Sequence, residues 1–343
     1  FLGVSAFFTL SGFLIATLVL REHASTGSVD LRAFWVRRAR RLLPALFVTA
    51  LGILWFATTS GSNSQADSVA EVGPWAMLYL AIWRFYVEGQ SYTDLFAGSA
   101  TSPLLHLWSL AIEEQFYLLF PLIAVACART SNMRRALGIA TTIGLAGSFG
   151  SMAYFTLTDA DLSRIYYGTD TRAAELLIGV GGAILVDSRR HLLTDRVQGA
   201  ATAIGAFALT AMAALWITVD ETNPWLNRGG FAVHAVLTLV VILTVAPPGP
   251  LRTLFSRPMM LFVGRISYGL YLIHWPVYLW LTPDRTGVDD IRLTALRIGL
   301  SMFLATGSYL FIEKPIRDGR VVFGPLPVGV FALVAALFAT LPV

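Results

Sequence analysis

Cysteine is almost absent from this sequence, and so are the short motifs of several large enzyme classes. The 343 residues include one cysteine, Cys127, which excludes a disulfide within the chain and a zinc site built from cysteines. There is no Walker loop, no His-Glu-x-x-His pair, no Gly-x-Ser-x-Gly elbow and no acidic cluster with metal-ligand spacing. ATP hydrolysis, metalloprotease and serine-hydrolase activities are therefore unsupported, and we expect no bound metal or cofactor.

Charge is also scarce, because only 13% of the residues are charged while 56% are hydrophobic. The apolar residues gather in long runs, and no run shows the strict alternation of a barrel strand. The sequence therefore predicts an all-α bundle of membrane-spanning helices surrounded by membrane lipid. The net charge of +4 comes with arginines in short loops between the runs. Positive-inside topology explains this pattern better than a nucleic-acid partner does.

The apolar runs predict about ten full spans, whose loops alternate between arginine-rich and arginine-poor. A further apolar piece, Gly73–Val87, is short and contains Arg84. If it crossed the membrane, later arginines would fall on the wrong side, so we expect a re-entrant or interfacial helix there, after an outer loop at 60–72. The predicted spans are 1–20, 43–59, 104–128, 136–157, 173–187, 199–218, 230–247, 259–281, 291–312 and 325–342.

The spans form one predicted membrane-embedded domain, 1–343. It begins at the apolar Phe1 without an initiator methionine, so we expect that its start is trimmed. The last predicted span ends on the outer side, which suggests an extracytoplasmic domain after Val343. Two groups of glycines are expected to let helices approach closely: Gly144, Gly147 and Gly150, and Gly179, Gly181 and Gly182.

The first candidate for a reaction site is the stretch from His106 to Pro121, which sets a histidine and two adjacent carboxylates at the head of an apolar helix. An ionisable group near a bilayer core costs a few kcal/mol, so such groups mostly mark function. His106 and Glu113 are about two helical turns apart and share a face with Ser109, while Glu114 projects about 100° away. A structural ion pair is one explanation. The other is general acid/base catalysis, or orientation of a catalytic imidazole.

A second candidate is a polar stripe around His274 in another apolar run. Pro276 removes a backbone donor and crowds the carbonyl four residues back, so we expect the helix to bend or loosen near Leu272. A lone histidine is more often a hydrogen-bonded core residue, but the neighbouring hydroxyl groups favour a site. The stripe consists of Ser267, Tyr271, His274 and Tyr278, with Tyr268 beside the first.

Arginines provide two further candidates. The first is a cluster in a loop that we place in the cytoplasm, with the next span beginning near Leu43: Arg37, Arg38, Arg40 and Arg41. Topology alone requires a basic loop there, and this is one explanation of the cluster. Guanidinium groups also bind phosphate bidentately, so a phosphate-bearing ligand is the second explanation.

The other candidate is Arg172, three residues before Glu175. It either pairs with Glu175 or holds an anionic group or Glu113.

Four motifs together resemble the acyltransferase 3 family of integral-membrane bacterial O-acyltransferases. They are Gly3–Ile15, Arg37–Pro44, His106–Tyr117 and Gly264–Pro276, and the third is specific. Two weaker matches are Thr169–Arg172, which leads into Glu175–Gly179, and Phe311–Arg317. The resemblance covers nearly the whole chain, from Phe1 to about Arg317.

The resemblance implies transfer of an acyl group from cytoplasmic acyl-CoA to a hydroxyl of a carbohydrate or glycolipid at the outer face of the bacterial plasma membrane. The arginine cluster would hold the phosphates of acyl-CoA. The implied catalytic residues are Glu113, Glu114, His106 and His274, and the further substrate contacts are Arg172, Ser109, Ser267, Tyr268 and Tyr271.

The chain departs from the family pattern at its start. The family's first span normally carries an arginine and, ten residues later, a histidine regarded as catalytic, and no residue here matches that histidine. We therefore expect the general base to lie upstream of Phe1. The outward exit of the last predicted span resembles the family branch that continues into an SGNH-type domain.

Two functions of other classes fit the same residues. A transporter or flippase of a lipid-linked or acylated glycan would also place ionisable residues in a membrane cavity, and an inverted internal repeat, which we do not find, would favour it. A non-catalytic membrane scaffold would make Glu113 dispensable. The sequence does not decide the acceptor, the oligomeric state or the acyl group, for which we expect acetyl or another short chain.

Overall fold

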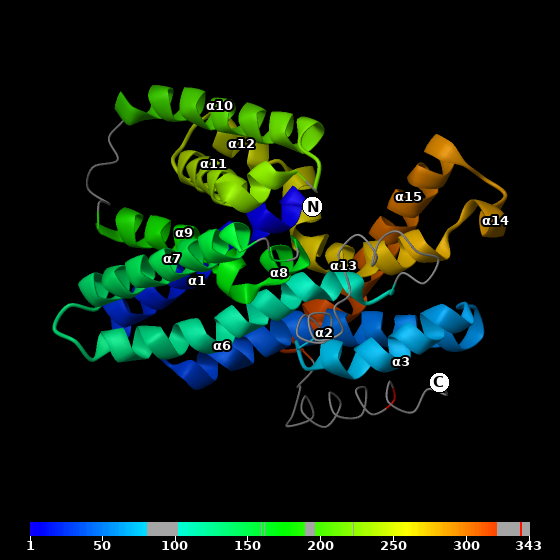
Figure 1. Cartoon of the computed structure of the whole chain (residues 1–343). Coiled ribbons are helices and arrows are strands. Elements are labelled where there is room, and N and C mark those ends of the chain that lie inside the picture. Colours follow the sequence, from blue (N-terminus) through cyan, green and yellow to red (C-terminus); the bar gives the residue numbers. More distant parts are fainter. Residues whose placement is uncertain are drawn as a thin grey trace. The chain divides into compact units, whose positions relative to one another are not determined.

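The computed structural model describes residues 1–80, 102–158, 160, 162–188, 196–221, 223–320 and 337. Within these ranges the regular structure is helical throughout (Figure 1). This confirms the all-α prediction, which depended on the long apolar runs. Of the last predicted span, 325–342, only residue 337 is among the described residues.

The chain divides into two compact units. The first unit consists of Phe1–Leu31 and Ile112–Met260, and the second consists of Arg32–Ala111 and Leu261–Val343. The first holds α1 (Leu2–Thr26), most of α6 (Trp108–Ala128), α7 (Met133–Leu157), α8 (Leu162–Tyr167), α9 (Thr169–Ser188), α10 (Arg196–Thr218), η3 (Leu226–Gly230), α11 (Phe231–Val245) and α12 (Pro250–Phe255). The second holds α2 (Leu31–Thr59), α3 (Asn63–Met77), η1 (Leu105–Leu107), most of α13 (Pro258–Trp280), α14 (Pro283–Thr286), α15 (Asp290–Ser308), η4 (Tyr309–Glu313) and α16 (Lys314–Arg317).

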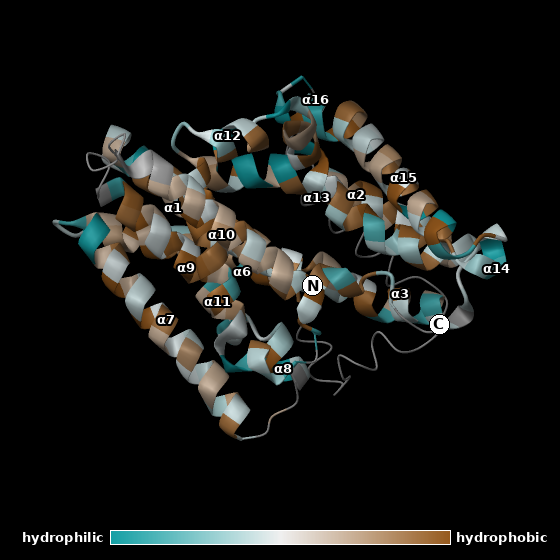
Figure 2. Cartoon of the chain, turned by 90° about the horizontal axis from the view of Figure 1, so that it is seen from above, coloured by the Kyte–Doolittle hydropathy of each residue, from teal (hydrophilic) through white to brown (hydrophobic). Residues whose placement is uncertain are grey.

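Seven helical segments among the described residues are long and apolar enough to cross a membrane. Figure 2 shows the hydrophobic residues spread along most of α7 and α15, with hydrophilic residues near one end of each. Helices α9 and α13 were also predicted as spans, but they are not among these seven segments. Charged residues interrupt α9, and an arginine, a histidine and several tyrosines lower the hydropathy of α13. The count of about ten spans therefore stays a prediction. The seven segments are Leu2–Thr26, Leu31–Thr59, Leu105–Ala128, Met133–Leu157, Ala200–Thr218, Leu226–Val245 and Asp290–Arg317.

Helix α2 begins at Leu31 and not near Leu43. The arginine cluster, Arg37–Arg41, therefore lies on a helix, and the prediction of a loop was wrong. Arginine and leucine are good helix formers, and the positive-inside rule constrains the side of the membrane on which charges lie without breaking the backbone helix.

Helix α3 begins inside the stretch 60–72 that was predicted to be a loop, so this prediction was also wrong. Ser62 and Gln65 form a capping box: the Ser62 hydroxyl accepts from the Gln65 backbone N–H at 3.3 Å, and the Gln65 side chain accepts from the Ser62 N–H at 3.2 Å. Capping starts a helix even where the residues are polar. Residues 81–87 lie outside the described residues, so the re-entrant helix stays a prediction.

Helices α1 and α9 cross so closely that two glycines are required at the contact. A Cβ atom at Gly12 would overlap the backbone carbonyl of Leu176, and one at Gly179 would overlap that of Thr9. This close contact between backbones is the arrangement that small residues allow in membrane proteins. It fixes α9, which carries Arg172 and Glu175, against α1.

The two predicted glycine groups fulfil this role only in part. Gly144 faces the Leu177 side chain, where a Cβ would lie 2.8 Å from Cδ1, and Gly182 faces the side chain of Leu239. Added Cβ atoms at the other three members, Gly147, Gly150 and Gly181, would meet no heavy atom within 4 Å. The prediction was correct for Gly144, Gly179 and Gly182 because these glycines lie on the inward side of their helices.

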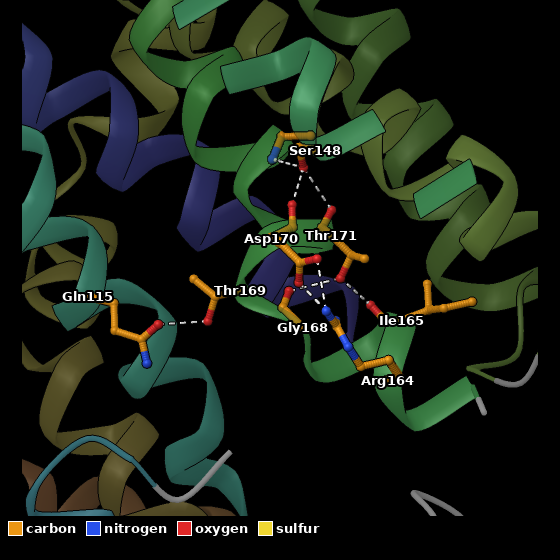
Figure 3. A network of polar contacts seen from close by, with 9 residues as sticks. Gln115, Ser148, Arg164, Ile165, Gly168, Thr169, Asp170 and Thr171 are labelled. Carbon is orange, nitrogen blue, oxygen red and sulfur yellow. Dashed lines mark hydrogen bonds and ion pairs between the residues drawn. The ribbon is translucent and has the colours of Figure 1, made fainter. Parts of the chain in front are cut away.

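A network of polar contacts fixes the first turn of α9 (Figure 3). Arg164 donates two hydrogen bonds to the Asp170 carboxylate, at 2.8 and 2.9 Å. The Ser148 hydroxyl of α7 donates to the Asp170 carbonyl at 2.6 Å and accepts from the Ala174 N–H at 2.9 Å. Thr169 donates to the side-chain oxygen of Gln115 at 2.8 Å, which ties α9 to α6. The Asp170 carbonyl and the Ala174 N–H are helical partners four residues apart, so the Ser148 hydroxyl bridges them and anchors α7 to this turn of α9.

The Asp170 carboxylate precedes the apolar part of α9, and its ionised form is favoured. Burial acts to raise the pKa of this carboxyl, but the hydrogen bonds and charge of Arg164 outweigh burial and hold the pKa below its ordinary value. The ionised form therefore contributes stability above the ordinary carboxyl pKa, and this contribution is lost as the pH falls through the lowered value.

Substitution Gly12→Ala or Gly179→Ala is expected to destabilise the protein by about 1–3 kcal/mol or more, because the added methyl group must push two backbones apart. Thermal unfolding of the purified protein in detergent measures the effect. The matched control is Gly181→Ala on the same helix as Gly179, where the added methyl group meets open space. Equal melting temperatures for Gly179→Ala and Gly181→Ala would contradict the close contact.

Substitution Asp170→Asn is expected to lower the free energy of unfolding by about 1 kcal/mol at neutral pH, because it removes a charge-assisted pair with Arg164 that is partly exposed to solvent. The difference from the unsubstituted protein should shrink as the pH falls below about 4, where the carboxylate becomes protonated. Melting temperatures across a pH series report this. A difference that grows toward acid pH would show that the carboxylate does not stabilise α9.

Candidate active site

The second unit brings together the histidines of two motifs that are far apart in the sequence. The rings of His106 and His274 have centroids 5.8 Å apart, and the Tyr271 ring lies 5.6 Å from the first and 5.5 Å from the second. His106 is buried in η1, whereas His274 is exposed on α13. The two imidazoles and the phenol thus form one cluster with an exposed side, which we call the histidine cluster.

A chain of hydroxyl groups supports the histidine cluster. The Tyr271 hydroxyl donates to the His106 carbonyl at 2.5 Å. The Ser109 hydroxyl lies 2.5 Å from the Tyr271 oxygen, a pair in which either group can donate, and it also lies 3.4 Å from the His106 carbonyl. Ser109 and Tyr271 therefore hold the backbone beside His106 in place.

Backbone carbonyls determine which nitrogen of each histidine carries a proton. The Nε2 atom of His106 lies 3.0 Å from the Leu272 carbonyl, and the Nδ1 atom of His274 lies 2.6 Å from the Tyr271 carbonyl. A carbonyl oxygen can only accept, so each of these nitrogens is the donor. In neutral His274 the Nε2 atom consequently keeps the lone pair, which is the requirement for accepting a proton.

The Leu272 carbonyl is available to His106 because of Pro276. In a regular helix this carbonyl would accept from the N–H four residues later, but that residue is a proline and has no N–H. The Nε2–H of His106 takes the place of the missing donor. The Leu272 carbonyl is therefore the point at which the distant His106 binds α13, while a bend or loosening of the helix there stays a prediction.

The other members of the predicted stripe lie differently. The Ser267 hydroxyl is exposed and donates to the Gly264 carbonyl of its own helix at 3.0 Å, while Tyr268 is buried. Tyr278 is 49% exposed, and its ring stacks on Trp275 with an interplanar angle of 4°. The structure therefore brings Tyr271 and His274 into the histidine cluster, with Ser267 at a separate part of α13.

Three residues on α13 or in contact with its end were not predicted from the sequence. The Trp275 indole donates to the Ser102 carbonyl at 3.0 Å, which ties the segment before η1 to α13. The Arg297 guanidinium lies 3.8 Å from the centroid of the Tyr278 ring and donates to the Leu281 carbonyl at 2.8 and 3.0 Å. An arginine inside an apolar run was an available signal for Arg297. No comparable signal marks Ser102.

In the first unit, Glu113 is 1% exposed and accepts short hydrogen bonds from the Ser11 and Tyr117 hydroxyls. Ser11 belongs to α1, so the carboxylate joins α1 to α6. Glu114 is half-buried on another side of α6. Two hydroxyl donors suit an ionised carboxylate, which only accepts hydrogen bonds.

His106 does not lie on the α-helix that carries Glu113, because residues 105–107 form a 3₁₀ turn and α6 begins at Trp108. The assumption of one continuous α-helix from residue 104 was therefore wrong. Tight 3₁₀ turns are common where helices begin, and their period differs from 3.6 residues. The partners of His106 lie in the second unit and those of Glu113 in the first, and a common face for the two stays a prediction.

Arg172 is 1% exposed and lies inside the first unit. Its guanidinium pairs with Glu175 at 3.3 Å, which is one of the two arrangements expected from their spacing. The guanidinium carbon lies 3.7 Å from the centroid of the Phe231 ring and 5.2 Å from that of Tyr166. Cation–π contacts of this kind stabilise a desolvated arginine. The substrate-binding role suggested for Arg172 stays a prediction.

The arginine cluster occupies the first turns of α2. Arg37, Arg40 and Arg41 are exposed and follow the three- and four-residue spacing that places side chains on one helix face. Arg38 is half-buried, with its guanidinium carbon 5.6 Å from the centroid of the Phe34 ring. The exposed face of α2 therefore presents several guanidinium groups together, which suits a ligand with phosphate groups.

The sequence matches known proteins over nearly all of its length. The family model described as an acyltransferase domain covers residues 1–342. "Putative O-acetyltransferase SACOL0978" of Staphylococcus aureus strain COL is 35% identical over 325 residues, which cover 92% of this chain and 52% of that protein. "Putative peptidoglycan O-acetyltransferase YrhL" of Bacillus subtilis strain 168 is 35% identical over 329 residues, with 92% and 50% covered.

A third relative, "Peptidoglycan O-acetyltransferase OatA" of Listeria monocytogenes, is 33% identical over 331 residues, which cover 94% of this chain and 52% of that protein. The chain thus spans about half the length of the curated relatives it matches. No solved structure matches it. Because the family model covers all but the last residue, the chain belongs to the acyltransferase 3 family.

Proposed function

We propose that this protein is a multi-pass O-acyltransferase of the bacterial plasma membrane. It transfers an acetyl or another short acyl group from cytoplasmic acyl-CoA to a hydroxyl of a cell-envelope glycan or glycolipid. The family membership and the names of the relatives, which are O-acetyltransferases and include peptidoglycan O-acetyltransferases, support the reaction class. The seven apolar helices support a site within the membrane.

The observation that carries the proposal is the histidine cluster. His274 is exposed, and its Nδ1–H donates to the Tyr271 carbonyl at 2.6 Å, which leaves the lone pair of Nε2 available. A neutral imidazole with one nitrogen anchored and the other accessible is the group that general-base catalysis requires. His106 lies beside it, and the Leu272 carbonyl at 3.0 Å holds its ring in place.

The proposed reaction is a direct transfer. The acceptor oxygen forms a bond to the thioester carbon while its proton passes to an imidazole nitrogen. The carbon–sulfur bond then breaks, and the proton goes from the imidazolium to the leaving thiolate, so the products are an ester and free CoA. His274 is the base that we assign within this chain.

Glu113 is assigned to orientation. Its carboxylate is buried and holds the Ser11 and Tyr117 hydroxyls, so its negative charge is fixed at one place between α1 and α6. Glu114, which is half-buried, is assigned an assisting role in the same stretch.

The arginine cluster is assigned to the donor. Acyl-CoA carries phosphate groups, and each guanidinium offers five N–H donors in a planar fork. Arg37, Arg40 and Arg41 are exposed and share one face of α2, and we assign this face to those phosphates. Attraction between these charges and the donor is expected to weaken as salt concentration rises.

Substitution His274→Ala is expected to lower kcat by about 100-fold or more, because it removes the accessible proton acceptor. The assay is release of free thiol from acetyl-CoA by the full-length protein in nanodiscs, with solubilised cell-wall glycan as acceptor. His23→Ala, which alters a histidine in the last turn of α1, is the control. A His274→Ala variant with more than half of the normal kcat would exclude His274 as the base. A protein that neither binds nor cleaves acyl-CoA would refute the proposed function.

The paired substitution Arg40→Gln with Arg41→Gln is expected to raise KM for acetyl-CoA by about tenfold for each lost phosphate contact, at about 1.4 kcal/mol per contact. The KM for the glycan should stay within twofold. The same variant should lose most of the salt dependence of KM. A larger change in glycan KM than in acetyl-CoA KM would contradict the assignment of α2 to the donor.

A further inference from the structure

Arg297 of α15 is a half-buried cation that the proposed function does not use. It lies in the apolar segment Asp290–Arg317, about 10 Å along the helix axis from Asp290. An arginine inside such a segment is costly, and residues of this kind mostly mark function. Arg292, by contrast, is exposed near the start of the same helix. The position of Arg297 therefore calls for a physical explanation.

The structure holds the guanidinium of Arg297 in one place. Its Nε and Nη2 atoms donate to the Leu281 carbonyl, just beyond the last residue of α13, at 3.0 and 2.8 Å. Its central carbon lies 3.8 Å from the centroid of the Tyr278 ring. That ring stacks on Trp275, with the two centroids 5.7 Å apart. The charge of Arg297 is thus fixed against the end of α13.

One explanation of these contacts is a helix cap, because carbonyls at the end of a helix lack intrahelical donors. A cap accounts for two of the five N–H groups of a guanidinium, so the others remain for further acceptors. Among the residues that the structure describes, no carboxylate forms an ion pair with Arg297. Its positive charge is therefore held in place without a negative charge from the described chain to balance it.

Tyr278 places this charge beside the histidine cluster. It follows His274 by four residues and Tyr271 by seven on α13, and these spacings put the three side chains on one face of the helix. His274 and Tyr278 are both exposed there. All of these residues lie in the second unit. A substrate group that contacts Arg297 beside the Tyr278 ring therefore lies about one helical turn from the imidazole that we assign as the base.

We propose that Arg297 binds a carboxylate of the acceptor glycan and so places a hydroxyl of that glycan at His274. The inference rests on the proposed function, because that function assigns His274 as the base. It adds a second helix to the acceptor site, and it makes an acidic glycan the preferred acceptor.

A carboxylate suits this place because of its shape and its charge. The planar fork of a guanidinium matches the two oxygens of a carboxylate, and such charge-assisted pairs are stronger than neutral hydrogen bonds. In apolar surroundings an ion pair also contributes more than it does in water. The acceptor is favoured over the donor because Arg297 is attached to the helix of the proposed base, whereas the donor phosphates are assigned to α2.

The experiment measures KM for two matched acceptors, with the full-length protein in nanodiscs and acetyl-CoA as donor. One acceptor is a peptidoglycan disaccharide with a free carboxylate, and the other is its methyl ester, which keeps the sugars and removes the charge. Arg297→Gln is expected to raise KM for the acid about tenfold and to change KM for the ester less than about twofold. Arg292→Gln, which alters an exposed arginine of the same helix, is the control and should leave both values unchanged.

Arg297→Lys separates the charge from the helix cap. Lysine keeps the positive charge but lacks the planar fork that donates twice to the Leu281 carbonyl. This variant is expected to keep KM for the acid within about threefold of normal, because the charge remains. Equal losses with both acceptors in the Lys and Gln variants would show a cap alone and overturn the inference. If Arg297→Gln fails to fold, the unsubstituted protein still decides, since equal KM values for acid and ester would overturn it as well.

Two further results would assign Arg297 to another role. A rise in KM for acetyl-CoA with unchanged KM for the acid would place a donor phosphate at Arg297. An equal fall in kcat with both acceptors would show a role in the chemical step. Either result overturns the inference while the proposed function stands, because transfer still occurs. If the unsubstituted protein neither binds nor cleaves acetyl-CoA, the proposed function falls, and this inference falls with it.

Discussion

The cost of burying polar groups among apolar helices determines how the ionisable side chains of this protein are arranged. Arg172 is buried with Glu175 as its ion-pair partner and Phe231 against its guanidinium. Glu113 is buried with two hydroxyl donors, and Glu313 with one. Ser11 belongs to α1 and Phe231 to α11, so these two contacts also fix one helix against another, whereas Glu175, Tyr117 and Ser308 lie on the same helical segment as their partners. The same contacts that satisfy a polar group therefore shape the candidate site.

The positions of most helices could be predicted because an apolar run is a property of neighbouring residues. The starts of α2 and α3 could not be predicted from hydropathy, because helix propensity and capping set them. Arginines continue α2 as a helix, and Ser62 with Gln65 begins α3 within a polar stretch. Similarly, the 3₁₀ turn at His106 depends on how the chain enters α6, which a regular helical period does not describe.

The residues of the candidate site could be listed from the sequence, but their partners could not. His106 and His274 were expected because histidines in apolar segments are costly, and both lie in the histidine cluster. The Ser11 hydroxyl near Glu113 and the Thr9 carbonyl near Gly179 belong to distant segments, and no local pattern predicts such pairs. Arg297 is different, since a charge inside an apolar run was visible in the sequence before its contact with Tyr278 was known.

Pro276 links a defect in one helix to the chemistry of a distant side chain. Because it lacks an N–H, the Leu272 carbonyl is left to bind the Nε2–H of His106. This bond selects one tautomer of an imidazole that belongs to another part of the chain. A residue with an N–H at position 276 would supply the helix with its own donor and compete with His106 for the same carbonyl. Both histidines would still be present, yet the ring of His106 would be free to rotate and to exchange its tautomer. The proton-transfer properties of this cluster thus depend on a hydrogen atom that the backbone does not have.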